Sequence, residues 1–248
     1  MKSYWLETTG SIEKGVGFSQ FSPVHIGWLV CFVLFTTGMC LFYRSLKKEH
    51  RVLARYIVAG AVVADEVFKM AVLFIGGHFT KNYLPLHLCS INIFLIAYHA
   101  WKPGHVLGNF LYAVCIPGAL AALLFPGWTK LPLANFMHIH SFTLHILLVV
   151  YPMMLLASGE IRPDWSTIPK LLCILGSFAL VALAVNLVLD TNYMYLMYAP
   201  RNNPLYWFQK MFGNHLVGFM VILPGVLAAM YLPWLRLQSR RPVFPKHA

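Results

Sequence analysis

The sequence has few charged residues. Asp, Glu, Lys and Arg make up 11% of its 248 residues, whereas a soluble domain carries about 25%. Hydrophobic residues make up 59%, and the mean hydropathy is +0.66. Because the deficit of charge extends along the whole chain, it excludes an ordinary soluble domain and predicts a chain whose main solvent is lipid.

Paired cysteines are also missing. The five cysteines stand singly, at Cys31, Cys40, Cys89, Cys115 and Cys173, and no CxxC pair occurs. This spacing predicts neither a disulfide framework nor a zinc ribbon. We therefore expect no resident metal and no cofactor, and four of the thiols lie in apolar runs as small hydrophobic side chains.

A leader sequence and a nucleic-acid-binding stripe are not expected either. The first twenty residues have no apolar core and no small-residue cleavage site, so the first apolar helix should be retained. The formal net charge is +11, but the basic residues lie in short segments between apolar runs. That distribution is typical of membrane orientation rather than of nucleic-acid binding.

Seven apolar segments are candidates to cross the bilayer core, which takes ~20 residues per helix. They run over 25–43, 52–76, 84–101, 105–125, 136–157, 168–189 and 214–235. Turn dipeptides such as Pro103-Gly104 and Pro126-Gly127 separate them. We therefore predict that residues 1–248 form one all-α bundle of seven transmembrane helices.

The distribution of lysine and arginine predicts the orientation of this bundle. Twelve of these residues follow the first, third, fifth and seventh segments, and six lie on the opposite side. The positive-inside rule then places the N-terminus outside and the C-terminus in the cytoplasm. The location expected from this reading is the bacterial cytoplasmic membrane.

Ionisable and polar side chains inside the apolar segments are the strongest functional signal, because they are costly in lipid. Most of them fall in the outer halves of the predicted helices or in the outer loops. They are Asp65, Glu66, Lys69, His87, Cys89, His138, His140, His145, Asn192, Tyr193, Asn214 and His215. This convergence predicts one site in the outer half of the membrane.

The histidines of 136–157 divide into different roles. His138 and His145 share a face, whereas His140 points roughly 140° away from His145 at 100° per residue. His138 and the more distant His99 fit amphipathic anchors near helix ends. Asp65 and Lys69 fit a structural ion pair, whereas His145, nine residues into an apolar helix, is the better candidate for chemistry.

A thiol becomes a useful nucleophile when a base lies beside it. Cys89 with an imidazole from 136–157 would allow acyl transfer to or from a lipid oxygen. Three alternatives use some of the same atoms. They are a metal hydrolase with His87, His140 and His145 as ligands, haem held by histidines of two helices, and a transporter with Glu66 and the histidines as a proton relay.

Several motifs together resemble the YwaF-like family of bacterial integral membrane proteins. They are LPLHLCS (84–90), PGALAALLFP (117–126), His140 with His145, RPDW (162–165) and NYMYLMYAP (192–200), in that order. The match extends from about 84 to 200, and YLPWL (231–235) matches loosely. The turn FGNHLVG (212–218) departs from the proline-rich turn expected in the family.

The resemblance implies a relationship to a human transmembrane acyltransferase that builds ether phospholipids with an essential cysteine and histidine. Carried over, these residues are Cys89 and His145. We therefore predict a lipid-directed acyltransferase or acyl-ester hydrolase with membrane lipids as its partners. The residues expected to support the site are His87, His140, Glu66, Asn192, Tyr193 and Asn214.

Overall fold

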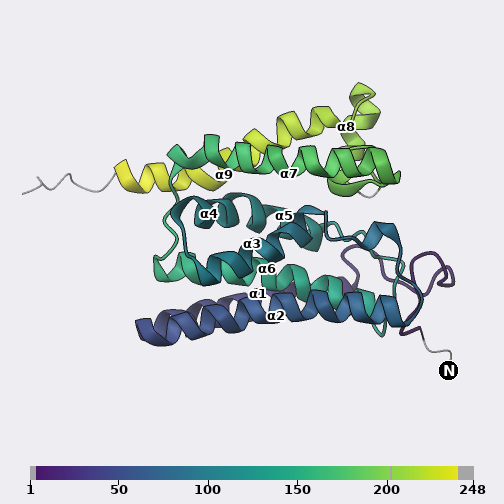
Figure 1. The fold of residues 1–248 in the computed structure, drawn as a ribbon, viewed down its shortest axis with the longest axis horizontal. Helices are drawn as coiled ribbons and strands as arrows, with labels where there is room; N and C mark the ends of the chain where they lie inside the picture. Colours follow the sequence, from purple (N-terminus) through teal and green to yellow (C-terminus); the bar gives the residue numbers. More distant parts are fainter. Residues whose placement is uncertain (1–3, 202, 240–248) are drawn as a thin grey trace, which may run out of the picture.

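The computed structural model describes residues 4–201 and 203–239, and this part of the chain is helical, without strands. The main helices are α1 (Pro23–Ser45), α2 (Lys48–Ile75), α3 (Leu88–Trp101), α4 (His105–Phe110), α5 (Ile116–Leu124), α6 (Phe136–Ser158), α7 (Ile168–Leu189), α8 (Leu205–Phe212) and α9 (Leu216–Ser239). The short helices are η1 (Lys81–Tyr83), η2 (Leu111–Cys115), η3 (Trp165–Thr167) and η4 (Tyr193–Tyr195). The long helices run along a common axis (Figure 1).

Helix α6 is at the centre of the bundle. Its most apolar stretch is 67% buried, whereas those of α1, α7 and α9 are 11%, 17% and 17% buried. It packs against α1, α2, α3 and α5. Figure 1 shows α7, α8 and α9 on the far side of α4 and α5 from α1 and α2. The histidines of α6 therefore lie in the interior.

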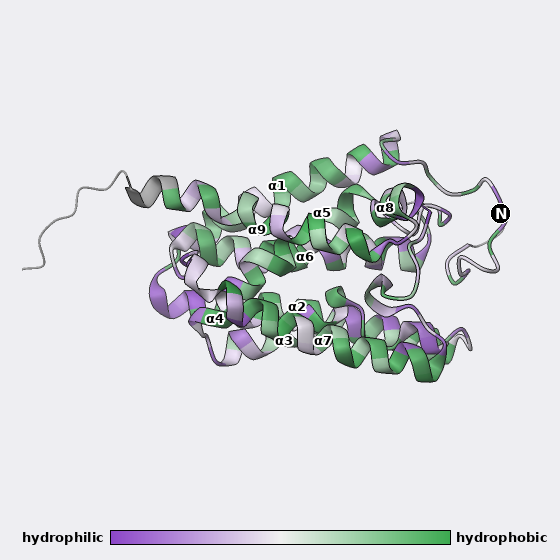
Figure 2. Ribbon diagram, turned by 90° about the horizontal axis from the view of Figure 1, so that it is seen from above, coloured by the Kyte–Doolittle hydropathy of each residue, from purple (hydrophilic) through white to green (hydrophobic). Residues whose placement is uncertain are grey.

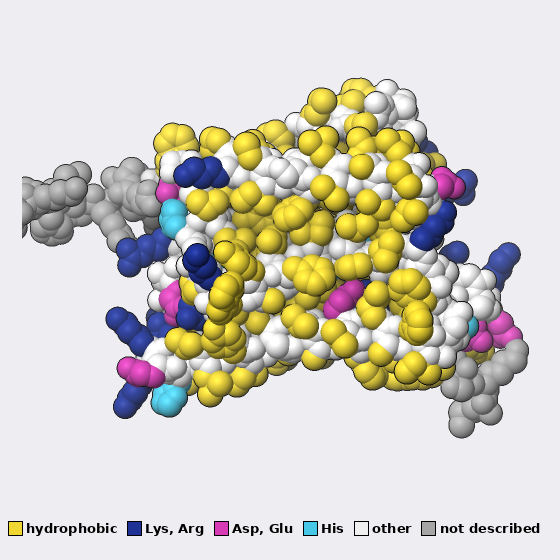
Figure 3. Space-filling model, viewed as in Figure 1, with side chains coloured by type: hydrophobic (Ala, Val, Ile, Leu, Met, Phe, Trp, Pro, Cys, Tyr) yellow, Lys and Arg dark blue, Asp and Glu magenta, His cyan; other side chains and the backbone are white. Residues whose placement is uncertain are grey.

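The surface has the pattern expected of a membrane protein. Hydrophilic residues gather toward the two ends of the bundle in Figure 2, and apolar residues cover its middle. Figure 3 shows lysine and arginine near the two ends of an apolar flank, which also exposes an acidic side chain near its middle. Large apolar side chains such as Leu34, Val188 and Met220 are fully exposed on the outer helices. Lipid is the solvent that such a surface suits.

Five helical stretches of the described chain are long and apolar enough to cross a membrane. They are Pro23–Ser45, His105–Leu124, Phe136–Ser158, Trp165–Leu189 and Leu216–Leu235. The chain is thus a multi-pass membrane protein. Helices α2 and α3 are not among these five stretches. Helix α2 carries three charged side chains in its apolar half, and α3 has only 14 residues. The count of seven spans and the orientation stay predictions.

The start of the third helix differs from the sequence-based expectation. Helix α3 begins at Leu88 rather than at 84, and both Leu84 and His87 have extended backbone angles. Pro85 disfavours helical geometry in the residue before it, which accounts for the late start. Cys89 therefore lies in the first turn of α3 rather than farther along the helix.

The fourth segment contains a π-helical turn that the sequence analysis did not predict. The π turn Leu111–Cys115 lies between α4 and α5, just before Pro117. Proline cannot donate a backbone hydrogen bond, and a wider turn accommodates the missing bond. The side chains of this turn are all buried, so the irregular backbone is covered by protein.

Helix α8 was also missed, and α9 begins at Leu216 rather than at 214. The chain leaves α8 through Gly213, whose φ is +70°, a region that favours glycine. Gly218 then allows α8 to lie against α9. A Cβ there would come 2.7 Å from a Leu205 methyl group and 2.9 Å from the Phe208 ring.

Candidate functional site

The predicted polar residues lie toward one end of the bundle, which we call the loop end. It comprises the segments 4–22, 76–87, 125–135 and 190–215, and the N-terminal segment lies there (Figure 1). The charged residues 65, 66 and 69, the Cys89 thiol and the histidines of α6 come from helices α2, α3 and α6. Helix α6 packs against both of the others. Several of these side chains contact one another across α2, α3 and α6.

A buried charged group connects α2 to α6. Lys69 Nζ lies 2.5 Å from Glu66 Oε1. His140 Nδ1 lies 2.9 Å from Asp65 Oδ2, and its Nε2 lies 3.8 Å from Glu66 Oε2. The short approach to Asp65 is not aligned as a hydrogen bond, so His140 Nδ1 and both of these carboxylate oxygens are buried without a hydrogen-bond partner. This group therefore has unused hydrogen-bonding capacity.

His145 has a defined tautomer. Its Nδ1 lies 2.6 Å from the Ser141 carbonyl oxygen, and a carbonyl can only accept, so Nδ1 carries the proton. Nε2 then presents a lone pair, and it has no hydrogen-bond partner in the described part of the chain. The ring stacks on Trp128 with centroids 5.4 Å apart and is 7% exposed. The arrangement suits a proton acceptor.

His87 has the opposite tautomer. Its Nδ1 accepts a hydrogen bond from the Met194 amide at 3.3 Å, so the neutral ring carries its proton on Nε2. The ring also contacts Tyr193 and Tyr195, with centroids 5.2 and 5.7 Å away. His87 lies close enough to His145 for electrostatic interaction. The site thus contains one imidazole that can accept a proton and one that can donate a hydrogen bond.

Cys89 is half-buried in the first turn of α3. Lys69 and Glu66 lie close enough to act on its thiol electrostatically, and Lys69 acts on His87 as well. Burial of the thiol and the Glu66 carboxylate oppose the thiolate, whereas the N-terminal turn of the helix and the Lys69 ammonium group favour it. Within residues 4–201 and 203–239, no hydrogen bond connects the Cys89 sulfur to His145.

Three of the predicted supporting residues hold the loop together. Asn192 donates to the Tyr198 carbonyl at 2.9 Å and accepts from the Met197 amide at 3.0 Å. Tyr193 is buried, and its hydroxyl donates to the Lys81 carbonyl. Asn214 accepts from the Leu216 amide at 2.9 Å and is exposed. Asn192 and Asn214 therefore organise backbone, whereas Tyr193 also contacts His87.

Other histidines have structural surroundings. His138 donates from Nδ1 to the Leu131 carbonyl at 2.9 Å and accepts at Nε2 from Trp28 at 2.9 Å. His99 Nδ1 lies 3.0 Å from the Tyr151 hydroxyl. Both rings are buried, so neither is an exposed amphipathic anchor of the kind expected, and each ring instead joins segments of the interior.

Sequence analysis missed some residues of the site. Trp128 lies in the loop before α6, and only the tertiary contact reveals its stacking on His145. Tyr195 lies near Cys89, and burial, with a smaller contribution from Cys89, raises the pKa of its hydroxyl. Lys69 was assigned to structure, although a lysine three residues after Glu66 in an apolar helix was a signal for the site.

Metal binding receives no geometric support here. Among the side chains that the structure describes, no group of three or more His, Cys, Asp or Glu residues is placed to hold a metal ion. The chemistry considered below therefore uses the side chains of the chain itself.

Comparison with known proteins agrees with the membrane fold. No curated protein and no solved structure matches the chain significantly. The TMEM164 family matches residues 20–231, which include every helix from α1 to α8, most of α9 and all the side chains of the site. The chain therefore belongs to the TMEM164 family.

Proposed function

We propose that this protein is a lipid-directed acyltransferase or acyl-ester hydrolase in which Cys89 is the nucleophile and His145 the base. The observation that carries the proposal is the tautomer of His145. Its Nδ1 is held by the Ser141 carbonyl, and its Nε2 is left without a partner in the interior, next to the helix that bears the thiol. A nucleophile, a base and an orienting group are the parts that covalent acyl transfer needs.

The first half-reaction would form a thioester. His145 Nε2 takes the proton from Cys89 Sγ, directly or through one water, and the thiolate attacks the carbonyl carbon of a lipid ester. The carbon–oxygen bond of that ester breaks, and the departing oxygen takes the proton from His145. Catalytic hydrogen bonds are often long before substrate binds, so the missing contact between the two residues is compatible with this step.

The second half-reaction would release the acyl group. A hydroxyl of a lysolipid, for transfer, or of water, for hydrolysis, gives its proton to His145 and attacks the thioester carbon. The carbon–sulfur bond then breaks and Cys89 is protonated again. The positive charge of Lys69 favours the thiolate, and Nε2–H of His87 supplies a donor for the negative oxygen of the intermediate.

A lipid is the substrate class that suits the position of the site. The helices around it expose apolar side chains along the flank of the molecule, so an acyl chain can approach from the bilayer without entering water. Asp65, whose side chain is 20% exposed, and His140 would then lie at the side of the site. Their role is to hold α2 against α6.

Thiol reactivity tests the proposal directly. A membrane-permeant acyl phosphonate or maleimide is applied to the protein in membranes, and labelling at each cysteine is quantified by mass spectrometry. Cys89 should react faster than Cys173, which is exposed on α7, and the difference should disappear in His145→Ala. Equal labelling of the two thiols, indifferent to His145, would refute the nucleophile assignment.

Proton-coupled transport is a second candidate, favoured by one observation. The group formed by Asp65, Glu66, Lys69 and His140 is buried in a helix pair and retains unpaired oxygen and nitrogen atoms, as a proton relay would. Lipid analysis of a deletion strain separates the two functions. An altered phospholipid acyl profile supports the enzyme, whereas altered solute uptake with unchanged lipids supports the transporter.

The finer location is also a proposal. The bias of basic residues and the YwaF-like motifs support a bacterial cytoplasmic membrane with the loop end outside. A single cysteine introduced near Lys130 should then react with an impermeant reagent in intact cells, and one near Lys47 should not. The reverse pattern would invert the orientation.

A further inference from the structure

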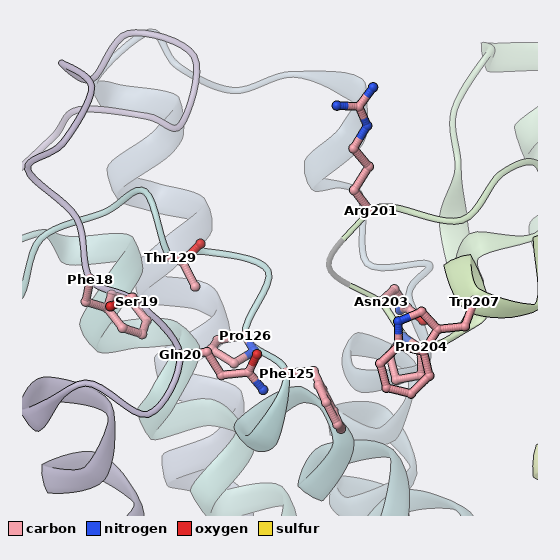
Figure 4. A pocket seen from close by; sticks show the side chains of 10 residues that line it. All are labelled: Phe18, Ser19, Gln20, Phe125, Pro126, Thr129, Arg201, Asn203, Pro204 and Trp207. Carbon is pink, nitrogen blue, oxygen red and sulfur yellow. The ribbon is translucent and has the colours of Figure 1, made fainter. Parts of the chain in front are cut away.

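An open cavity of about 460 Å³ lies at the loop end, away from Cys89. Its lining comes from three parts of the chain, namely Phe18 to Gln20, the loop with Phe125, Pro126 and Thr129, and Arg201 with Asn203, Pro204 and Trp207. Figure 4 shows the first and last of these facing one another across Phe125 and Pro126, with Arg201 at the rim and its guanidinium group directed away from the other lining side chains. A volume of this size is in the range of small-molecule sites.

The lining of this cavity favours an anion. None of the residues that line it is acidic, and Arg201 makes no ion pair with any described residue. The hydroxyl groups of Ser19 and Thr129 and the amide of Asn203 add neutral polar groups. A guanidinium group offers paired N–H donors that match phosphate oxygens. The rings of Phe18, Phe125 and Trp207 make the rest of the wall apolar.

Hydrogen bonds and close backbone packing hold two walls of the cavity together. The Phe18 amide donates to the Thr129 carbonyl at 2.8 Å. At Gly17, a Cβ would lie 2.1 Å from that same carbonyl oxygen, so only glycine permits this close approach. Gln20 also donates to the Leu124 carbonyl at 2.8 Å. These contacts fix the N-terminal segment against the loop that precedes α6.

The same segments reach the candidate site. Thr129 follows Trp128, which stacks on His145. Arg201 follows the loop in which Tyr193 and Tyr195 contact His87. Two walls of the cavity are thus continuous with the segments that contact the two imidazoles. The cavity and the candidate site are therefore built partly from the same two loops.

We propose that the rim of this cavity binds the phosphate of a phospholipid headgroup, with Arg201 as the main contact and the aromatic walls beside the glycerol region. The choice of a lipid as the ligand rests on the proposed function. The residues of the headgroup site are separate from the Cys89 thiol and the imidazoles. A free phosphate ester would share the chemistry of the headgroup but would lack the acyl chains.

Binding to the purified full chain in detergent tests the proposal, with calorimetry or thermal shift as the readout. The probes are dihexanoyl phosphatidylglycerol, dihexanoyl glycerol and glycerol 3-phosphate. The first should bind, and Arg201→Gln should weaken it about tenfold, as loss of a charge-assisted hydrogen bond predicts. Lys210→Gln, which removes a basic residue of α8 outside the cavity lining, is the matched control.

Each outcome decides a separate point. Equal binding of the neutral diglyceride, or indifference to Arg201→Gln, would overturn the headgroup site. Binding of glycerol 3-phosphate as tightly as the phospholipid would identify a soluble phosphate ester as the ligand instead. The measurement is repeated with Cys89→Ala, which should bind as wild type does. Retained binding with no acyl-transfer activity in wild type would refute the proposed function and leave the headgroup site standing.

Discussion

Each end of the bundle contains a polar cluster, and the two clusters differ in whether their carboxylate oxygens have hydrogen-bond partners. At the end opposite the loop end, both oxygens of Glu160 lie 3.0 Å from the Tyr43 hydroxyl, and Arg51 and Arg55 approach within 3.6 and 3.4 Å. At the loop end, Asp65, Glu66 and His140 retain buried atoms without hydrogen-bond partners.

The difference separates a structural cluster from a candidate working one. Buried polar groups are normally paired, and each exception needs a reason. Both oxygens of Glu160 have partners from the end of α1 and the start of α2, although Nε of Arg55 is buried without a hydrogen-bond partner. Such a cluster holds helices in register. At the loop end, Nε2 of His145 and Nε2–H of His87 have no hydrogen-bond partner among the described residues, which suits groups that must meet a substrate.

The largest expected effect comes from His145→Gln. If Nε2 is the base, acyl turnover should fall about 10²–10⁴-fold, the range of general-base catalysis, while thermal stability changes little. The matched variant is His138→Gln, seven residues earlier on the same face, where both ring nitrogens are already paired. Turnover per folded molecule and melting temperature are measured for both.

His138→Gln should show the opposite pattern. Loss of a buried partner for Trp28 and Leu131 should reduce the free energy of unfolding by about 1–3 kcal/mol, and the folded fraction should keep its turnover. If the two variants lose activity and stability in parallel, the distinction between a paired and an open histidine fails.

Glu160→Ala should have the largest effect on stability at the opposite end. Removal of this carboxylate leaves the hydroxyl of the buried Tyr43 without its acceptor and Arg51 and Arg55 without their ion-pair partner, which should lower the free energy of unfolding by about 2 kcal/mol. Glu49→Ala is the control, because Glu49 is exposed in the first turn of α2. Equal melting temperatures for the two variants would show that the cluster is not structural.

Much of the fold could be predicted because long apolar runs fix helices by local pattern. The prediction of 168–189 agrees with α7, and 136–157 differs from α6 by one residue. The start of α3 was missed because Pro85 lies inside an apolar run, where hydropathy alone cannot show that helical geometry is lost. Helix α8 was missed because its eight residues are far fewer than a membrane span needs, so a search for long apolar runs passes over it.

The contacts that distinguish the histidines of α6 could not be predicted from the sequence. His138 and His145 share one face of one helix, so periodicity treats them alike. What separates them is Trp28 and the Leu131 carbonyl on one ring and Trp128 on the other. These contacts come from segments distant in sequence or from loops, and they exist only after the chain has folded.

Lys69→Gln should slow the reaction of the Cys89 thiol about tenfold, because it removes the positive charge that favours the thiolate. The rate is measured with a membrane-permeant maleimide after the other four cysteines are replaced by alanine. Lys14→Gln, in the exposed N-terminal segment, should leave the rate unchanged. An unchanged rate in Lys69→Gln would assign the lysine to the ion pair with Glu66 alone.

The smallest effect concerns pH at the end opposite the loop end. A hydrogen bond from His105 Nε2, 2.9 Å from Asp164 Oδ2, together with Ser166, lowers the pKa of Asp164 below its usual value of 3.8. A lowered pKa means that the contribution to stability is present above the usual value and is lost as the pH falls through the lowered one. Because this carboxylate is exposed, the contribution should be a few tenths of a kcal/mol.

Asp164→Asn should therefore melt at a slightly lower temperature than wild type at pH 6, and this difference in melting temperature should vanish as the pH falls below the usual pKa of aspartate. In a His105→Ala background, Asp164→Asn should change the melting temperature much less, because the partner that lowers the pKa of the carboxyl group is already absent. A difference in melting temperature that persists unchanged in acid would assign the effect to the hydrogen bond that Asp164 accepts from the Ser166 amide. In that case Glu160 would be the carboxylate whose charge stabilises this end of the bundle.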